Sequence, residues 1–322
     1  MTVNGTGSGS VTSSPAGIHC PGTCSYDFTA GTTVTLTATA ATGSSFAGWY
    51  STGWPPPCMG TTAPCKVTMN QADSIRATFN VVMESVDVLN GPQPGASGTI
   101  TVSGPGTQLT VGPGQARQAF FKYGAVVTLT PTPASSSAFI GWTGDCSGYG
   151  ACVIAATRSL SIQGSFAVGQ KLQVRLTGRG AGTVTSIPAA ISCPGTCAGL
   201  FGVDSEVTLT ATPAPGSYFA GWPLSSGCDD SESTCTFQMA NSDDLDVADF
   251  RLDHCLVPNV TRLALAKARS RLVAYSCRAG TIARAYSKHV KKGAVISQKP
   301  KAGRQLARGA KVHLVLSRGK RH

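Results

Sequence analysis

The chain has 322 residues, including 38 glycines, 19 prolines and 12 cysteines, and only 13% of its residues are charged. Apolar residues recur in strand-like runs, which excludes a disordered chain, and no apolar run is long enough to span a membrane. Residues 1–250 carry 8 Lys and Arg against 14 Asp and Glu, whereas residues 251–322 carry 18 Lys and Arg against one acid, Asp253. The resulting net charges of −6 and +17 predict two parts with different tasks and an anionic partner for the basic part.

Internal repeats organise the acidic part of the chain. The sequence VTLT begins at Val34, Val127 and Val207, and each copy is followed by Phe-x-Gly-Trp, two cysteines and a strand that ends in Phe. The alternation of Val or Leu with Thr predicts half-buried strands, and Gly, Ser and Pro clusters predict turns. Three β modules are therefore expected, at residues 1–80, 81–167 and 168–251.

Each module has one tryptophan in the Phe-x-Gly-Trp sequence, namely Trp49, Trp142 and Trp222. Such a residue could serve as a ligand platform or as the anchor of a small core. The core role is favoured, because a buried aromatic ring dominates the energetics of a small domain.

The sequence CPGTC occurs at 20–24 and 193–197, where the two cysteines could bind zinc, act in redox chemistry or form a disulfide. The middle module has PGQAR at 113–117 instead but keeps its second cysteine pair. This favours independent disulfides over a four-thiolate zinc site, and the spacing is not the redox motif Cys-x-x-Cys. The predicted pairs are Cys20–Cys24, Cys58–Cys65, Cys146–Cys152, Cys193–Cys197, Cys228–Cys235 and Cys255–Cys277. Since disulfides persist in oxidising surroundings, the protein is expected outside the cytoplasm.

The sequence has no signal peptide at its start. Met1 aligns with Val174, which lies inside the first predicted strand of the third module. The first strand is therefore expected to be truncated, with an export signal encoded upstream.

The modules resemble a known family of bacterial repeats. The residues that carry the resemblance are Val11-Thr-Ser-Ser-Pro15-x-Gly17-Ile18-x-Cys20, Val34-Thr-Leu-Thr, Phe46-Ala-Gly-Trp49 and the strand that ends at Phe79. This pattern is similar to the divergent internalin-type B repeats of secreted and surface proteins, in a disulfide-bearing form that resembles actinobacterial examples. The resemblance implies small β-rich, β-grasp-like units that act as spacers or adhesive modules and carry no catalytic residue.

The basic part begins with a helix pattern. Leu265, Ala268 and Leu272 follow the i, i+3, i+7 spacing of one helix face. Thr261 is the expected N-cap, and Gly280 is the expected end of the helical zone. Alternation of apolar with mostly polar residues at 311–316 then predicts a strand.

This basic segment closely resembles a PASTA domain, the module of penicillin-binding proteins and bacterial Ser/Thr kinases. The matching residues are Val257-Pro258-Asn259-Val260, Leu263/Ala264, Ser287-x-x-Val290-x-x-Gly293, Val295-Ile296-Ser297-Gln298-x-Pro300, Gly303, Gly309 and Val312-x-Leu314-x-Leu316-Ser317. The resemblance implies an extracytoplasmic α+β module at 254–319 with one helix on a small sheet, followed by a basic tail at 320–322. The whole chain is thus expected to be multidomain and mainly β.

Many PASTA domains recognise peptidoglycan fragments, so the resemblance implies that residues 255–318 bind peptidoglycan or another anionic wall polymer. Arg forks and Lys point charges suit carboxylates and phosphates. The candidate binding residues are Arg278, Arg284, Lys288, Lys291, Lys292, Gln298, Lys299, Lys301 and Arg304. The alternative is a solvated basic face without a specific site.

The favoured interpretation is a non-enzymatic secreted or cell-surface protein, whose β modules form a stalk or adhesive array for an unidentified surface-protein or glycan partner. One alternative is a structural fragment of a larger exported protein or enzyme with its catalytic part upstream of Met1. Another is nucleic-acid binding by the basic end. Nucleic acid is disfavoured, because Tyr275 and Tyr286 are the only aromatic residues in 251–322 and form no stacking platform.

No catalytic residue, cofactor or metal site is predicted, because none of the five histidines lies in a nucleophile or metal-binding motif. The acidic run Asp243, Asp244 and Asp246, with Asp249, is similar to a calcium site. It lacks the loop glycine and the closing glutamate of an EF-hand. A solvated strand edge is therefore predicted for this run.

Overall fold

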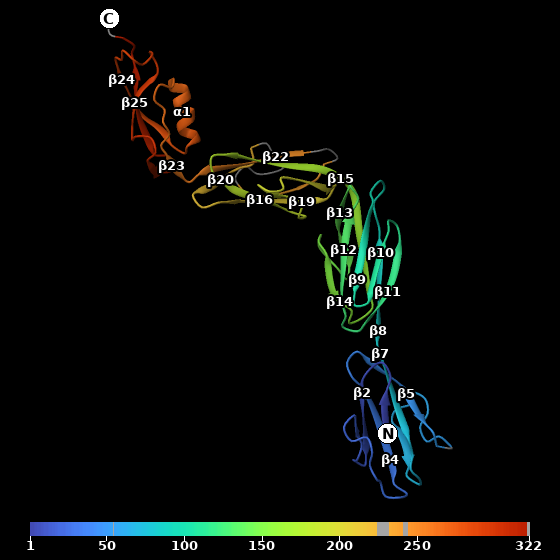
Figure 1. The fold of residues 1–322 in the computed structure, drawn as a ribbon. Helices are drawn as coiled ribbons and strands as arrows, with labels where there is room; N and C mark the ends of the chain where they lie inside the picture. The colour runs from blue at the N-terminus through green and yellow to red at the C-terminus, as the bar shows by residue number, and fades with distance from the viewer. Residues whose placement is uncertain (54, 224–231, 241–243, 321–322) are drawn as a thin grey trace. The chain divides into compact units, whose positions relative to one another are not determined.

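A computed structural model describes residues 1–53, 55–223, 232–240 and 244–320 (Figure 1). These residues form several small sheets, and their single α-helix lies in the C-terminal domain, which confirms the predicted mainly-β multidomain fold. No helix in the described ranges is long and apolar enough to cross a membrane.

The first repeat contains two small sheets, with strand orders β1-β7-β5 and β3-β2-β4-β6. Its first and last strands, β1 and β7, pair in parallel, while all other pairs are antiparallel. The strands are β1 Thr2–Asn4, β2 Gly9–Ser14, β3 His19–Cys20, β4 Thr33–Ala40, β5 Ser44–Ser51, β6 Cys65–Thr68 and β7 Ile75–Val81. In β4, Val34 and Leu36 are buried in a core to which both sheets contribute, as the alternation with Thr predicts.

The second repeat has a sheet β10-β9-β12-β14 and a second group in which β8 pairs with β11 and β15, and β13 pairs with β15. Its strands are β8 Met83–Asn90, β9 Gly98–Gly104, β10 Thr107–Val111, β11 Ala116–Lys122, β12 Val126–Pro133, β13 Ser137–Gly144, β14 Cys152–Ala155 and β15 Leu160–Gly178. The N-terminal residues of β15 pair with β8 of this repeat, and its C-terminal residues pair with the third repeat. Strand β15 continues without interruption through residues 167–169.

The third repeat again has a four-stranded sheet, β17-β16-β19-β21, and a group in which β22 lies between β15 and β20 while β18 pairs with β15. Its own strands are β16 Gly182–Ile187, β17 Ser192–Cys193, β18 Ala198–Gly202, β19 Glu206–Pro213, β20 Ser217–Gly221, β21 Thr234–Gln238 and β22 Asp244–Leu252. The first and last strands of the repeat, β15 and β22, are parallel, as in the first repeat.

The Phe-x-Gly-Trp sequence forms a β-bulge that turns both aromatic rings inward. In β5 the pairing register shifts between Phe46 and Gly48, so the extra residue lets Phe46 and Trp49 share one face. Their ring centroids are 5.1 Å apart, and Phe46 also contacts the closing Phe79 at 5.5 Å. The left-handed backbone that such a bulge requires, with φ between +123° and +137°, occurs at Gly48, Gly141 and Gly221.

The three tryptophans are core residues, as predicted, with exposed fractions of 4%, 5% and 1% for Trp49, Trp142 and Trp222. Each indole N–H donates a hydrogen bond to a backbone carbonyl of the loop that follows. The pairs are Trp49 to Thr62 at 3.0 Å, Trp142 to Gly150 at 2.7 Å and Trp222 to Glu232 at 3.0 Å. The ring therefore fills the core and also holds the loop.

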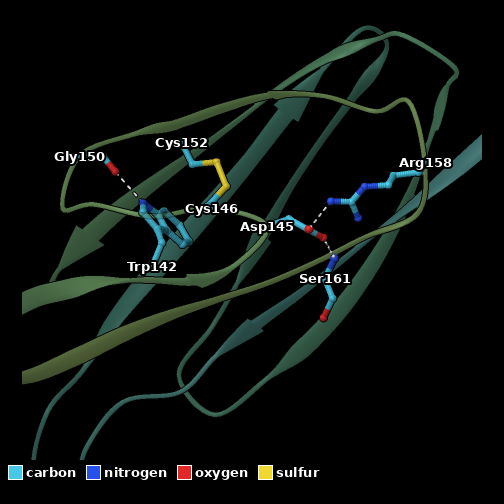
Figure 2. Close-up of a disulfide and its surroundings, with 7 residues drawn as sticks. All are labelled: Trp142, Asp145, Cys146, Gly150, Cys152, Arg158 and Ser161. Carbon is cyan, nitrogen blue, oxygen red and sulfur yellow. Dashed lines mark hydrogen bonds and ion pairs between the residues drawn. A yellow bond between two sulfur atoms is a disulfide. The ribbon is translucent and has the colours of Figure 1, made fainter.

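In the second repeat this loop is closed by a disulfide and fixed at its start by a carboxylate (Figure 2). Asp145 accepts hydrogen bonds from Arg158 at 2.5 Å and from the backbone N–H of Ser161 at 2.7 Å. The Arg158 guanidinium and the Ser161 N–H hold the pKa of the Asp145 carboxyl below its ordinary value.

Five of the six predicted disulfides are present in the described residues. They are Cys20–Cys24, Cys58–Cys65, Cys146–Cys152, Cys193–Cys197 and Cys255–Cys277. The sixth predicted pair, Cys228–Cys235, involves Cys228, which lies outside the described residues. Because these bonds use the cysteines in pairs, each CPGTC closes a short loop rather than a metal site.

The solvated strand edge predicted for the acidic run is wrong for Asp246 and Asp249. Both side chains are buried, with exposed fractions of 1% and 9%, and their strand β22 is not at an edge. Asp246 lies four residues before the closing Phe, where the first two repeats have the buried residues Ile75 and Ile162. The predicted run also includes Asp243, which lies outside the described residues.

The C-terminal domain packs one helix against small sheets of order β24-β27-β25 and β23-β26. Its elements are β23 His254–Leu256, α1 Leu265–Ala274, β24 Arg278–Ala285, β25 Val295–Lys299, β26 Gln305–Ala307 and β27 Lys311–Ser317. The predicted helix face is confirmed, since Ala268 and Leu272 are fully buried and Leu265 packs against the same core.

The predicted helix ends are wrong at both termini. Thr261 donates its N–H and its hydroxyl to Asn259 Oδ1, at 3.0 and 2.8 Å, and Arg262 has a left-handed φ of +63°. The helix therefore begins at Leu265, without a side-chain cap. It ends at Ala274, because the left-handed Ser276 turns the chain into β24.

Candidate functional site

The loop that precedes β25 presents a group of cationic side chains on a rigid backbone. Ser287 Oγ accepts hydrogen bonds from the N–H groups of His289 and Val290, at 3.3 and 3.1 Å. At the other end of the loop, Ser317 Oγ donates to the Val290 carbonyl at 2.7 Å, and Gly293 donates to the Ser317 carbonyl at 2.9 Å. Gly293 has φ +84°, which favours glycine in this turn. The Ser287 hydroxyl and the positive φ of Gly293 account for the Ser and Gly of the Ser-x-x-Val-x-x-Gly sequence.

Arg262 joins this loop from a distant part of the sequence. Its N–H donates to the Val295 carbonyl at 2.7 Å, and the Val295 N–H donates to the Leu263 carbonyl at 2.9 Å. The result is a groove of about 760 Å³ between the two segments, lined by residues 289–294, Arg262 and Ala264. We call Arg262, His289, Lys291 and Lys292 the loop groove.

A second group, of three cationic side chains and one histidine, lies on the exposed face of the three-stranded sheet. Arg278 of β24 pairs with Lys311 of β27, and Lys299 of β25 pairs with His313 of β27. All four side chains are exposed. We call these four residues the cationic row.

The predicted binding residues therefore divide among several places. Lys291 and Lys292 line the loop groove, and Arg278 and Lys299 belong to the cationic row. The other predicted Lys and Arg residues are exposed outside both groups, with Arg284 in β24, Lys288 in the loop, and Lys301 and Arg304 between β25 and β26.

Gln298 makes hydrogen bonds inside the domain, and its binding role stays a prediction. Its Oε1 accepts the N–H of Val260 at 2.7 Å, and its Nε2 donates to the carbonyls of Pro258 at 2.9 Å and Pro300 at 3.4 Å. These bonds tie β25 to the Val-Pro-Asn-Val segment. Both ends of the amide are thus used inside the domain.

Comparison of the sequence with known families matches the repeats to the divergent InlB B-repeat domain at residues 1–82, 92–168 and 172–253. The chain belongs to this family. Residues 256–318 match the PASTA domain. Extracellular-type domains and five disulfides are consistent with an exported protein.

One curated relative, a probable serine/threonine-protein kinase of Clostridium acetobutylicum, is 38% identical over 63 residues, which are 20% of this chain. The match spans only 10% of that kinase.

Among solved structures, the extracellular region of the Ser/Thr kinase PrkC from Staphylococcus aureus is 13% identical, covers 52% of this chain and 54% of its own, and has a TM-score of 0.20. The Bacillus anthracis TIE protein is 10% identical, with 69% and 43% covered and a TM-score of 0.21. A Mobiluncus mulieris adhesin is 14% identical, with 42% and 60% covered and a TM-score of 0.21. Scores this low carry no argument about function.

The sequence indicated the charge of the PASTA domain but not how its cations are grouped. Arg262 and His289 of the loop groove, and Lys311 and His313 of the cationic row, were not among the predicted residues. The alternation at 311–316 places Lys311 and His313 on the exposed face of a strand, so this signal was available. Nothing in the sequence indicated that Arg262 lies beside Val295.

Proposed function

We propose that this chain is an exported, non-enzymatic protein that is held at the bacterial cell wall by its PASTA domain. The domain binds peptidoglycan or another anionic wall polymer through its basic surface. The disulfide-closed B-repeats serve as a stalk or adhesive array that the wall-bound domain presents to a surface-protein or glycan partner.

The observation that carries the proposal is uncompensated positive charge on the PASTA domain. Residues 251–322 contain 18 Lys and Arg but one acid, Asp253, whose carboxylate lies 2.8 Å from His254. The loop groove and the cationic row therefore have no acidic side chain of their own domain to pair with. An anionic partner from outside would supply charge-assisted hydrogen bonds at both groups.

The test is co-sedimentation of the oxidised full-length chain with purified bacterial cell walls, at low and at physiological salt. One variant replaces Lys291, Lys292, Lys299 and Lys311 with Gln. Its matched control removes the same number of exposed charges from the repeats, through Lys66→Gln, Arg117→Gln, Lys122→Gln and Arg175→Gln. We expect the unsubstituted chain and the control to sediment with the walls at both salt concentrations, and the PASTA variant to remain in solution.

Two results would contradict the proposal. If the unsubstituted chain stays in solution at physiological salt, the PASTA domain is not a wall anchor. If both variants lose binding to the same extent, the chain acts as a nonspecific polycation and its PASTA domain has no special part in binding.

A further inference from the structure

The cationic row brings together side chains from three strands of the PASTA sheet. Lys311 and His313 are two residues apart on β27, so their side chains are about 7 Å apart on one face. Arg278 lies beside Lys311 on one neighbouring strand, and Lys299 lies beside His313 on the other, each about 4.8 Å away across the sheet. The row thus crosses the sheet obliquely, with one cationic or protonatable group at each step.

Gly280 and Thr281 of β24 fix the position of the His313 ring in the row. Gly280 lies on the same face, and a Cβ at this position would be 2.9 Å from His313 Nδ1 and 3.2 Å from Lys311 Cβ. The Thr281 N–H donates to His313 Nδ1 at 3.1 Å, so Nε2 carries the proton of the neutral ring. Glycine at 280 therefore leaves room for the ring, and Thr281 orients it.

The row is unfavourable for the isolated domain. Like charges directly opposite one another on neighbouring strands destabilise a sheet, and Arg278–Lys311 is such a pair. Asp253 is the one acid of residues 251–322, and it lies beside His254. No acidic side chain of the domain therefore balances the Arg278–Lys311 pair. An arrangement that costs stability and is exposed along its whole length fits an external anion.

We propose that the cationic row binds a linear phosphodiester polymer, which runs obliquely across β24, β27 and β25. The proposal rests on the proposed function, because the cell wall would supply this polymer. A stem-peptide carboxylate would contact one or two members of the row, whereas a chain with a phosphate in every unit contacts all of it. The Arg fork and the Lys ammonium groups both suit phosphate oxygens.

The shape of the site supports an extended polymer. Small molecules bind in concave, mostly apolar pockets, whereas the row lies on the exposed face of a sheet. Single-stranded nucleic acid is disfavoured, because stacking of bases requires aromatic side chains and the row has only the His313 ring. The row can therefore recognise the charged groups of a ligand but offers no platform for stacked bases.

The experiment measures fluorescence anisotropy of labelled poly(glycerol phosphate) with the oxidised full-length chain at low and physiological salt. Two double variants carry the same change in net charge. Lys299→Gln with Lys311→Gln removes half of the row, and Lys267→Gln with Arg271→Gln removes two exposed cations of helix α1, outside the row and the loop groove. We expect the row variant to bind at least about a hundredfold more weakly, since each of its two lost charged hydrogen bonds weakens binding about tenfold or more. The α1 variant should keep the affinity of the unsubstituted chain.

Three results would overturn the proposal, provided that near-UV circular dichroism shows the variants folded. Equal losses in the two variants would mean nonspecific attraction, and no loss in the row variant would mean that the row does not touch the polymer. Duplex DNA of the same charge that binds as tightly, and depends equally on Lys299 and Lys311, would mean that the row does not select a wall polymer.

A last comparison separates this inference from the proposed function. Cell walls freed of their phosphate polymers retain peptidoglycan. If the chain sediments equally with these walls and with intact walls, the phosphodiester proposal fails while the wall-anchor function stands. If it sediments with neither, the wall-anchor function fails as well.

Discussion

At the scale of single residues, Asp246 is the clearest departure of one repeat from the other two. It lies in an inward-facing position where the other repeats have isoleucine, and its Oδ2 has no hydrogen-bond partner. Burial raises the pKa of the Asp246 carboxyl to about 6, and the neighbouring charge of Asp244 adds to this. A buried carboxylate in such surroundings destabilises the fold in its ionised form.

Because the pKa of Asp246 is raised, we expect the third repeat to become less stable as the pH rises. Because the pKa is higher in the folded state than the ordinary value of 3.8, protonation favours folding. The contribution is fully present below about pH 4 and is lost as the pH rises through about 6, with a magnitude on the order of 3 kcal/mol. Asp246→Ile should make the third repeat more stable at pH 7 and remove this part of the pH dependence.

Hydrogen exchange of β22 peptides at a series of pH values, corrected for the intrinsic exchange rate, measures the effect. Peptides of the first repeat, where Ile75 occupies the equivalent position, are the internal control. Parallel pH profiles for the unsubstituted chain and Asp246→Ile would show that the buried carboxyl does not govern the stability of this repeat.

At the scale of elements, the loop between β13 and β14 is held at three points. They are the Cys146–Cys152 disulfide, the indole N–H of Trp142, and the Asp145 carboxylate with Arg158 and Ser161. The disulfide reduces the conformational entropy of the unfolded chain, whereas the Trp142 and Asp145 hydrogen bonds act only in the folded state. Removing the disulfide therefore leaves a loop that still has its native hydrogen bonds.

We expect Cys146→Ala with Cys152→Ala to lower the free energy of unfolding of the second repeat by about 2 kcal/mol, the loop-entropy value for so short a ring. Denaturant dependence of hydrogen exchange in β12 and β13 measures this loss. Exchange in the first repeat should not change. An unaltered second repeat would mean that Trp142 and Asp145 suffice to hold the loop.

The alternation and spacing of apolar residues predicted strands and helices better than they predicted where these elements end and what they pair with. Alternation of Val and Leu with Thr identified β4, and the helix face of Ala268 and Leu272 followed from spacing alone. The N-cap at Thr261 failed, because Asn259 takes its N–H and hydroxyl and Arg262 breaks the helical path. Helix ends depend on such local competition for hydrogen bonds, which residue-type preferences for helix or cap positions do not describe.

The same limit applies to the candidate site. The excess of positive charge was visible in the sequence, and so was the exposed position of Lys311 in an alternating strand. The cationic row depends on the register of β24 and β25 against β27, which follows from packing of the whole domain. The hydrogen bonds of Gln298 were not predictable for a related reason, since its partners Val260 and Pro258 lie about forty residues away in the sequence.

At the scale of the whole molecule, the described residues form separate hydrophobic cores. The core of the first repeat draws only on residues 1–79, that of the third repeat on 172–250, and that of the PASTA domain on 255–316. In each repeat, the Phe of the last strand packs against the glycine that begins the second strand. The pairs are Phe79–Gly9, Phe166–Gly98 and Phe250–Gly182. A defect in one core should therefore remain within its repeat.

Gly9→Ala tests this expectation, because the added Cβ would collide with the ring of Phe79. Overpacking of this kind costs about 1–3 kcal/mol. We expect hydrogen exchange and limited proteolysis to show a destabilised first repeat beside an unchanged third repeat and PASTA domain. Gly150→Ala is the matched control, since a Cβ at position 150 meets no atom within 4 Å. Loss of protection in the PASTA domain of Gly9→Ala would contradict separate cores, and the PASTA domain would then depend on the repeats for its stability.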